Sequence, residues 1–467
     1  INAALNTKDE NDSPEEHFTD TIKAACGLAD PNAVWGMTQA APELVHWLLK
    51  LGVKFNMSGY DDVDLRNFGG QKKKRTAFAQ SDTGKQIMTA MIDAVRRKEA
   101  SGMVERFSHH SFLTLRLCGN ICCGCVIRDE YSQETVELPG DAVIVATGGM
   151  HGLFGNTTGS LSNTGEVTAE LFRLGVPLAN GEMIQYHPTT VKCGGKRMLI
   201  SEAARGEGGR LFAMKDGKQW YFMEEKYPEL GNLMPRDITA REIWKVSHES
   251  EVFLDMTEIS EEIISNKLSG LADDCMTYLH KDIRKEPVSV LPGIHYFMGG
   301  ILVDEQHRTP IQNLYAAGEC CAQYHGANRL GGNSLLGALY GGRVAAKSAC
   351  EQADVVDLSC ATQIDFPPTS QISEIKQLNK VMQETMGVVR NENTLLNGIQ
   401  TVQALTGNLP LLGMAVLKSA LARKESRGAH WREDYPKSND NDYLKTTVAR
   451  FDGKQIQISF VPVPERR

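Results

Sequence analysis

The chain has 467 residues, of which 41% are hydrophobic and 23% charged, so it can bury more than one hydrophobic core. Its formal net charge of −8, without a long Lys/Arg block, excludes a typical nucleic-acid partner. No apolar run reaches the ~20 residues of a membrane-spanning helix, and residues 1–10 lack the features of a signal peptide. Eleven scattered cysteines favour reduced thiols in a cytoplasmic protein.

Helical periodicity dominates the first 105 residues. Apolar residues at helical spacing predict a helix over residues 31–52, which Gly52 ends. Asp82 precedes a second predicted helix, which places five apolar residues on one face: Ile87, Met88, Met91, Ile92 and Val95. Between the two helices, four consecutive basic residues at 72–75 indicate a solvated loop.

Short strands are predicted between residues 106 and 146. Apolar runs at 112–117 and 126–127 flank a Gly-Asn turn. The cysteines in and beside these runs have neither the bacterial nor the plant-type ferredoxin spacing. This favours a packing role for the cysteines over an iron–sulfur cluster. The run 142–146 is almost purely apolar and is followed by Thr147, Gly148 and Gly149. Such a run is typical of a buried parallel strand that ends against a ligand.

The rest of the chain mixes the two kinds of element. Residues 181–297 combine short strands, a hairpin turn and helices, and a further strand over 313–319 precedes a Gly-rich helix over 334–349. Helical periodicity returns after residue 368, and residues 431–467 are predicted to be polar and extended.

Five polar clusters carry the candidate chemistry, each beside glycine or proline. They span residues 185–189, 201–209, 234–237, 295–300 and 325–334. If they converge, the pocket holds two histidines and two or three arginines with few carboxylates, which suits a small dianion. The alternative is a set of ordinary surface ion pairs and turn residues. Histidine spacing does not favour a metal, and no nucleophile lies beside a base.

The motifs together resemble the flavoprotein subunit of the succinate dehydrogenase/fumarate reductase family, a cousin of L-aspartate oxidase. In chain order they are INAAL, FGGQ, ATGG, QYHPTT, SEAARGEGG, PRD, HYFMGG, YAAGE, HGANRLGGNSL and ESRGAH. The resemblance implies an α/β fold, in which a doubly wound FAD-binding domain is interrupted by an α+β capping domain and followed by a helical domain. The implied bounds are 1–180 and 298–352 for the FAD-binding domain, 181–297 for the capping domain, 353–430 for the helical domain and 431–467 for an extended tail.

The resemblance also implies roles for individual side chains. His187 and Ser201 would hold one substrate carboxylate, whereas His295 and Arg329 would hold the other. Arg236 would donate a proton to the substrate carbon, with Glu202 and Arg205 as a relay. Because the pKa of arginine ordinarily exceeds ~12, such an acid needs burial and neighbouring cations. The implied FAD-binding positions are Ala146, Thr147, Gly148, Gly149, Glu166, Glu319, Asn333, Ser334 and Leu335.

Three departures from the family pattern stand out. The family's amino-terminal segment with the Gly-rich dinucleotide fingerprint, a principal anchor of FAD, does not occur in this sequence. The family's TGDG motif is Thr-Gly-Glu-Val here, with Glu166 in place of the aspartate. Phe68 stands where aspartate oxidases have an acidic residue that meets the substrate ammonium, which favours a dicarboxylate without an amine.

The resulting hypothesis is an FAD-dependent oxidoreductase that interconverts fumarate and succinate, with hydride transfer to or from flavin N5. L-aspartate oxidase is the second enzyme hypothesis, and a non-catalytic flavoprotein remnant is the third. The resemblance implies a small dicarboxylate substrate and an iron–sulfur subunit or another electron-transfer partner, in electron transport or anaerobic respiration. Any membrane association would be through partner subunits, and neither a metal nor a nucleic acid is expected.

Overall fold

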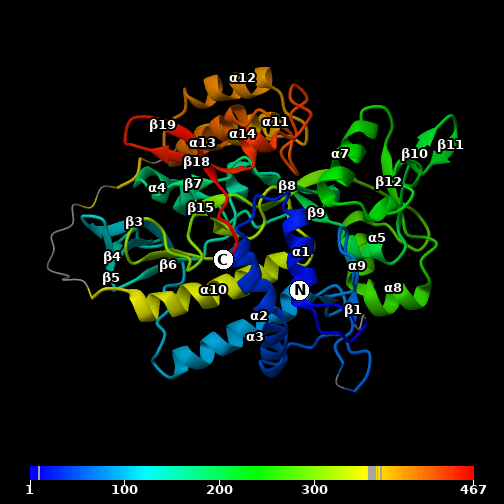
Figure 1. The fold of residues 1–467 in the computed structure, drawn as a ribbon, viewed down its shortest axis with the longest axis horizontal. Helices are drawn as coiled ribbons and strands as arrows, with labels where there is room; N and C mark the ends of the chain where they lie inside the picture. Colours follow the sequence, from blue (N-terminus) through cyan, green and yellow to red (C-terminus); the bar gives the residue numbers. More distant parts are fainter. Residues whose placement is uncertain (9–10, 61, 356–363, 365, 369–370) are drawn as a thin grey trace.

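The computed structural model describes residues 1–8, 11–60, 62–355, 364, 366–368 and 371–467. Figure 1 shows a lower region of helices and short strands, a lobe at the right and a helical layer at the top. The lower region begins with α1 (Pro14–Ala24), α2 (Pro31–Lys50), β1 (Leu65–Arg66), β2 (Thr76–Ala77) and α3 (Thr83–Ala100).

The two predicted helices of this region form, but they bury different amounts of surface. α2 begins where Asp30 accepts hydrogen bonds from two backbone N–H groups, and it buries its predicted apolar face. The predicted apolar face of α3 is only partly buried, since Met88, Ile92 and Val95 are 56%, 41% and 46% exposed. α3 contacts the neighbouring core along one edge, through Ile87 and Ala90.

The strands between residues 106 and 146 form two sheets. β3 (His110–Cys118), β4 (Ile121–Asp129) and β5 (Thr135–Pro139) make an antiparallel meander, and β6 (Val143–Val145) pairs in parallel with β16 (Leu314–Ala316). The predicted parallel strand is therefore confirmed. Its predicted full burial is wrong, since Ile144 is 40% exposed. In the described part of the chain β16 is the one strand that pairs with β6.

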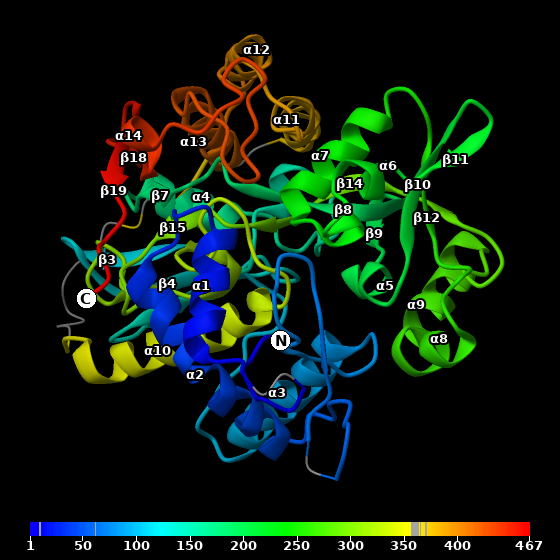
Figure 2. The same ribbon diagram turned by 45° about the vertical axis from the view of Figure 1, so that its right-hand side comes forward.

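Two further sheets build the right-hand lobe of Figures 1 and 2 and its base. β14 (Leu291–Phe297), β8 (Ile184–Cys193) and β9 (Lys196–Leu199) form one sheet in that order. The other has the order β11 (Lys218–Trp220), β10 (Arg210–Lys215), β12 (Val252–Asp255) and β13 (Val288–Ser289). The helices around them are α5 (Glu202–Gly206), α6 (Phe222–Lys226), α7 (Arg236–Val246), α8 (Glu261–Lys267) and α9 (Ser269–Asp274).

The carboxyl-terminal third contributes helices and a hairpin. The 20-residue helix α10 (Asn333–Gln352) lies in the lower region, whereas α11 (Ile372–Thr385), α12 (Glu392–Val402) and α13 (Asn408–Ala422) form the top layer in Figure 1. The segment 431–467, predicted as an extended tail, also forms a short helix and a hairpin. It contains α14 (Asp440–Tyr443) and the hairpin β18 (Lys445–Phe451) and β19 (Ile456–Pro462), and Val448 and Ala449 are buried.

This hairpin completes a five-stranded sheet, because β18 pairs with a short strand from the middle of the chain. The strand order is β17 (Cys321–Ala322), β15 (Gly300–Leu302), β7 (Leu178–Ala179), β18 and β19. α4 (Glu166–Arg173) lies beside this sheet. None of the helices in the described residues combines the length and apolar character of a membrane span.

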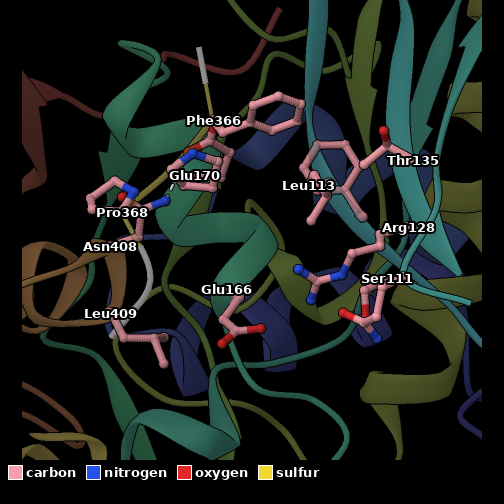
Figure 3. Close-up of a pocket in the computed structure, with 13 residues that line it drawn as sticks. Ser111, Leu113, Arg128, Thr135, Glu166, Glu170, Phe366, Pro368, Asn408 and Leu409 are labelled. Atoms are coloured by element: carbon pink, nitrogen blue, oxygen red, sulfur yellow. Dashed lines mark hydrogen bonds between the residues drawn. The ribbon is translucent and has the colours of Figure 1, made fainter. Parts of the chain in front are cut away.

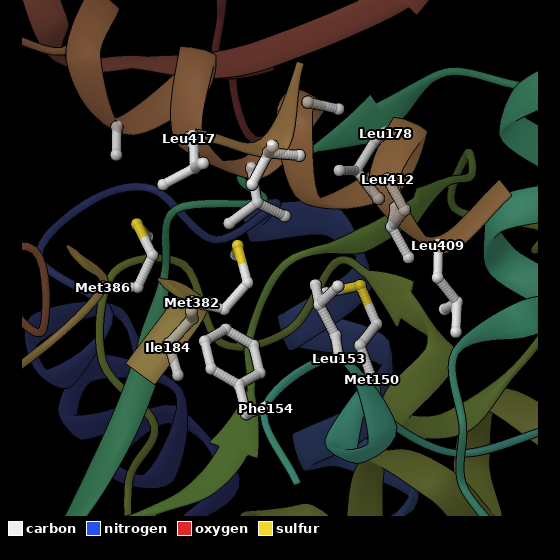
Figure 4. Close-up of a cluster of buried hydrophobic side chains, with 14 of the residues drawn as sticks. Met150, Leu153, Phe154, Leu178, Ile184, Met382, Met386, Leu409, Leu412 and Leu417 are labelled. Carbon is white, nitrogen blue, oxygen red and sulfur yellow. The ribbon is translucent and has the colours of Figure 1, made fainter. Parts of the chain in front are cut away.

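The top helices pack against the start of β8 through a hydrophobic core. Figure 4 shows Ile184 of β8 among side chains of the top layer and of the segment after β6, including Phe154, Met382 and Leu412. All four side chains are at most 1% exposed. Because β8 also carries His187, this core holds in place a strand on which the candidate chemistry depends.

The interpretation of residues 72–75 as a solvated loop is wrong for Arg75. Its side chain is fully buried, its Nη2 donates to Asp12 at 2.7 Å, and its Nη1 lies 3.1 Å from Asp20 of α1. A buried guanidinium needs such carboxylates, because an unpaired charge in the interior is costly. Nine cysteines of the described part are free thiols, whereas Cys118 forms a disulfide, contrary to the expectation of reduced thiols throughout.

A buried ionic network lies directly beside β8. Nε of Arg423 donates to Glu182 at 2.7 Å and its Nη1 donates to Glu425 at 2.8 Å, and all three side chains are fully buried. Glu182 also accepts a hydrogen bond from Thr447 of β18. The network therefore joins β8, the end of α13 and the carboxyl-terminal hairpin.

We expect Arg423→Met to lower the free energy of unfolding by about 3–5 kcal/mol, because it leaves the buried Glu182 carboxylate without its cation. Urea unfolding followed by circular dichroism measures the loss. The matched control is Arg343→Met, which removes an exposed pair with Glu43 and should cost less than about 1 kcal/mol. Equal losses of unfolding free energy in the two variants would contradict the conclusion that this network stabilises the packing of β8, α13 and the hairpin.

Candidate functional site

A cavity of about 190 Å³ is lined by residues from the base of the right-hand lobe and from the lower region. Each of the five polar clusters of the sequence contributes to its lining, so the alternative of scattered surface ion pairs is wrong. The predicted site residues that line it are Phe68, His187, Ser201, Glu202, Arg236, His295, Arg329, Ser334 and Leu335.

Local structure explains how these side chains converge. Alternation along β8 places Gln185 and His187 on one face, while the hydroxyl of Tyr186 donates to a backbone carbonyl of the top helices at 2.9 Å. Ser201 is the N-cap of α5, where its hydroxyl accepts from a backbone N–H at 3.3 Å. Arg236 is the first residue of α7, directly after a proline, so its side chain lies at the helix start beside the cavity.

Arg236 is held on two sides. Its Nε and Nη2 both donate to Oε2 of Glu202, the former at 2.9 Å, and its Nη1 donates to Oε1 of Gln185 at 3.1 Å. These bonds use one N–H of each nitrogen, so each terminal nitrogen keeps a second N–H. A buried guanidinium in this arrangement has a fixed orientation and retains donor capacity towards the cavity.

Glu202 lines the cavity and contacts a backbone N–H group and two guanidinium groups. Its Oε1 accepts from the backbone N–H of Gly69 at 3.1 Å and lies 3.4 Å from Nη2 of Arg205. Burial alone raises the pKa of Glu202, but the positive charges of Arg236 and Arg205 outweigh it and the pKa is lowered. A Cβ at position 69 would lie 2.7 Å from Oε1, so only glycine allows this approach. Arg205 does not line the cavity and lies behind Glu202.

The two histidines of the cavity are neutral. Burial, and next the charge of Arg236, lower the pKa values of both His187 and His295 well below 6.5. The rings of the two residues lie 5.2 Å apart. Nδ1 of His187 lies 3.2 Å from the backbone nitrogen of Thr189 and 3.1 Å from the carbonyl oxygen of the same residue. The buried Nε2 of His187 has no hydrogen-bond partner among the described residues, so it can pair with a ligand.

Arg329 faces the same cavity with incomplete pairing. Its Cζ lies 4.4 Å from the centre of the ring of Tyr296, and its buried Nε has no hydrogen-bond partner in the part of the chain that the structure describes. Burial, and next the charge of Arg236, lower the pKa of Arg329 to about 9. Among the described residues Glu202 is the one carboxylate that lines the cavity, against Arg236, Arg329 and Arg66. Such an excess of cations is complementary to a small dianion.

Arg66 and Gln185 are polar residues at this site for which the sequence predicted no role. Arg66 lines the cavity, lies 4.4 Å below the ring of Phe78 and leaves its buried Nε and Nη1 unpaired. No sequence signal marks it. Gln185 belongs to a quoted motif, and its spacing of two residues from His187 on a strand was the signal that could have found it.

The predicted FAD-binding positions fall in three places. Ser334 and Leu335 line the cavity, whereas the side chain of Asn333 does not, because it is bonded to Asn2, His17 and Thr21. The residues after β6 lie beside Glu319, since a Cβ on Gly149 would be 2.7 Å from that carboxylate. These are Ala146, Thr147, Gly148 and Gly149, and they lie outside the cavity lining.

Glu166 lies in a second cavity of about 450 Å³, away from the other predicted positions. Figure 3 shows it at the start of α4, opposite Arg128 of β4 and with Asn408 of α13 on the far side. Glu170 of the same helix also lines this cavity, and its carboxylate is bonded to Thr114, Arg173 and Asn408.

Comparisons with known proteins agree with this geometry. A family model described as FAD binding domain matches residues 1–335, and one described as fumarate reductase flavoprotein C-term matches residues 405–466. The succinate dehydrogenase flavoprotein subunit of Bacillus subtilis is 36% identical, over 100% of this chain and 90% of its own length. L-aspartate oxidase of Nostoc sp. is 31% identical, over 94% of this chain and 86% of its own.

A solved structure confirms the predicted fold class. A variant of the E. coli quinol fumarate reductase FrdA superimposes with a TM-score of 0.88 at 26% identity, covering 99% of this chain and 88% of that one. The doubly wound FAD-binding fold with an α+β insertion and a carboxyl-terminal helical region is therefore the fold of this chain.

The residues at the lower end of the cavity fit FAD. α10 begins after Gly332, whose φ of +86° favours glycine, and no side chain caps its N-terminus. The helix start therefore offers unpaired N–H groups and a positive dipole end, beside the hydroxyl of Ser334. Donors of this kind suit the carbonyl oxygens of a flavin ring, while the cationic end of the same cavity remains open to a dianion.

We expect the buried neutral histidines to make stability depend on pH. The pKa values of His187, His295 and His325 are all lowered, chiefly by burial, whereas an unfolded histidine titrates near 6.5. Below about pH 6.5 the unfolded chain therefore takes up protons that the folded chain excludes. Stability is fully present above this pH and falls, per histidine, by about 1.4 kcal/mol for each unit below it.

Urea unfolding at about pH 7.5 and about pH 5.5 measures this dependence. His295→Gln should flatten the pH dependence, whereas His248→Gln, at an exposed position, should leave it unchanged. If the unfolding free energy of His295→Gln changes with pH as much as that of the unaltered protein, His295 is protonated in the folded protein at the lower pH.

Proposed function

Because the chain belongs to the succinate dehydrogenase/fumarate reductase flavoprotein family, we propose that it interconverts fumarate and succinate. The chain is an oxidoreductase whose cofactor is FAD. The observation that carries the proposal is the single cavity in which buried arginines and two neutral histidines face one carboxylate. This charge pattern fits a four-carbon dicarboxylate, which brings two negative charges and no positive one.

The substrate would lie between two sets of carboxylate-binding groups. Nε2 of His187, which has no hydrogen-bond partner among the described residues, and the hydroxyl of Ser201 would donate to one carboxylate. His295 and Arg329 would donate to the other. Both sets combine a directional neutral donor with a second polar group, and together they fix the alkene between them.

Reduction of fumarate needs a hydride at one alkene carbon and a proton at the other. FAD, when bound and reduced, supplies the hydride from N5. Arg236 would supply the proton, since its guanidinium keeps N–H groups towards the cavity while Glu202 and Gln185 fix its orientation. Succinate oxidation would run the same two transfers in reverse.

An arginine acid needs a partner that replaces its proton. Glu202, 2.9 Å from Nε of Arg236, would return a proton to it, and Arg205 continues the relay at 3.4 Å from Glu202. Arg205 lies outside the cavity lining, so this relay would lead away from the cavity.

Two alternatives receive less support. L-aspartate carries an ammonium, and the cavity offers it no carboxylate besides the paired Glu202, since Phe68 stands at the discriminating position. An unpaired ammonium among arginines would bind poorly. A non-catalytic remnant would have no reason to retain the complete set of donors.

We further propose an electron-transfer partner, such as an iron–sulfur subunit. Any association of the chain with a membrane would be through this partner. The support is the similarity to a succinate dehydrogenase subunit and to a quinol fumarate reductase. We also propose that FAD lies along the positions named above, from Ser334 and Leu335 to Glu319, and that residues 181–297 act as a capping domain.

The FAD-loaded protein should oxidise a reduced viologen dye anaerobically when fumarate is added, and oxidise succinate with an artificial acceptor. We expect kcat/KM for succinate to exceed that for L-aspartate by about 100-fold or more, because an unpaired ammonium costs about 3 kcal/mol. Phe68→Glu should lower the ratio of kcat/KM for succinate to kcat/KM for L-aspartate. Faster turnover of L-aspartate by the unaltered protein would overturn the dicarboxylate proposal.

A further inference from the structure

We propose that Gln185 is a positioning residue, which orients the guanidinium of Arg236 and ties it to the loop that carries Arg329. The inference rests on the proposed function, because it concerns the group that would donate the proton. It extends that function with a residue that touches neither the substrate nor the cofactor in the proposed scheme. Gln185 is fully buried and does not line the cavity.

The hydrogen bonds of Gln185 fix which way its amide points. Nε2 donates to Oδ1 of Asn328 at 2.9 Å and to the backbone carbonyl of Arg329 at 2.8 Å. The carbonyl cannot donate, so the amide nitrogen must face it and Oε1 must face the other way. Oε1 is thereby presented to Nη1 of Arg236, from which it accepts at 3.1 Å.

Asn328 closes this set of bonds into a ring. Its Nδ2 donates at 3.1 Å to Asp237, which directly follows Arg236 in α7. The ring runs from Arg236 through Gln185, Asn328 and Asp237 back to Arg236, and it joins β8, α7 and the loop before α10. The proposed proton donor and the proposed carboxylate-binding arginine thus share one buried support.

The chemical type of the partner on Nη1 also matters. Glu202 already neutralises the edge of Arg236 formed by Nε and Nη2. A neutral amide on Nη1 adds direction without adding a second negative charge, which would hold the proton more tightly. Without Gln185, the guanidinium is held on one edge only, and a displacement of about 1 Å in such a group lowers rates by about 100-fold.

The test compares Gln185→Met with a matched control, Gln323→Met. Gln323 is also a buried glutamine, but its amide donates to the carbonyl of Asp304, outside the cavity. For Gln185→Met we expect kcat of fumarate reduction to fall about 100-fold. KM and the dissociation constant of malonate should each change less than about threefold, since His187, His295 and Arg329 remain.

A second readout separates positioning from a general structural defect. The solvent deuterium isotope effect on kcat should rise in Gln185→Met, because proton transfer becomes slower than the other steps. Gln185→Asn, which keeps an amide, should lose less activity, and Gln185→Glu should lose at least as much as Gln185→Met. Gln323→Met should resemble the unaltered protein in every readout, and flavin content and circular dichroism should be unchanged in all variants.

Several results would overturn the inference. They are an unchanged kcat in Gln185→Met, a rise in KM and malonate dissociation constant with kcat intact, an unaltered isotope effect, or an equal loss in Gln323→Met. If Gln185→Met fails to fold, the ranking of Gln185→Asn above Gln185→Glu decides the matter. No fumarate turnover by the unaltered protein would instead overturn the proposed function itself.

Discussion

The buried ion pair between Arg236 and Glu202 is the interaction on which the rest of the cavity depends. Two hydrogen bonds join the side chains, and both are almost completely removed from water. The desolvation of such a pair is costly, so it persists only where further bonds complete it. The backbone N–H of Gly69 and the amide of Gln185 supply those bonds, and the charge of Arg205, whose Nη2 lies 3.4 Å from Glu202, adds to them. What remains is an excess of positive charge towards the cavity, which a dianion would relieve.

The fold holds this pair from several sides at once. α5 and α7 supply Glu202 and Arg236, and they pack through Ala203, Ala204 and Ile243 into the core of the right-hand lobe. The opposite support is β8, which the core of Figure 4 and the Glu182–Arg423 pair fasten to the top helices. Segments far apart in the chain therefore have to be folded correctly before the site exists.

The residues that form the site were predicted more accurately from the sequence than the burial of the residues around it. Polar clusters flanked by glycine and proline stood out because such residues fit poorly into regular elements, and all five converge on one cavity. The burial of Arg75 and the exposure of Ile144 were misjudged for a common reason. Burial at these positions depends on which distant segment lies opposite, as Asp12 and Asp20 do for Arg75, and local periodicity carries no information about that partner. The support given by Gln185 was missed because its partners lie on α7 and the loop before α10.

The most direct test of the central claim is a single turnover of the reduced, FAD-loaded protein mixed with fumarate in the absence of oxygen. Flavin absorbance reports reoxidation, and malonate binding reports whether the cavity is intact. The account predicts rapid reoxidation by the unaltered protein, and loss of reoxidation in Arg236→Ala although that variant still binds malonate. Reoxidation at equal rates in the two proteins would contradict the role of Arg236 as the proton donor.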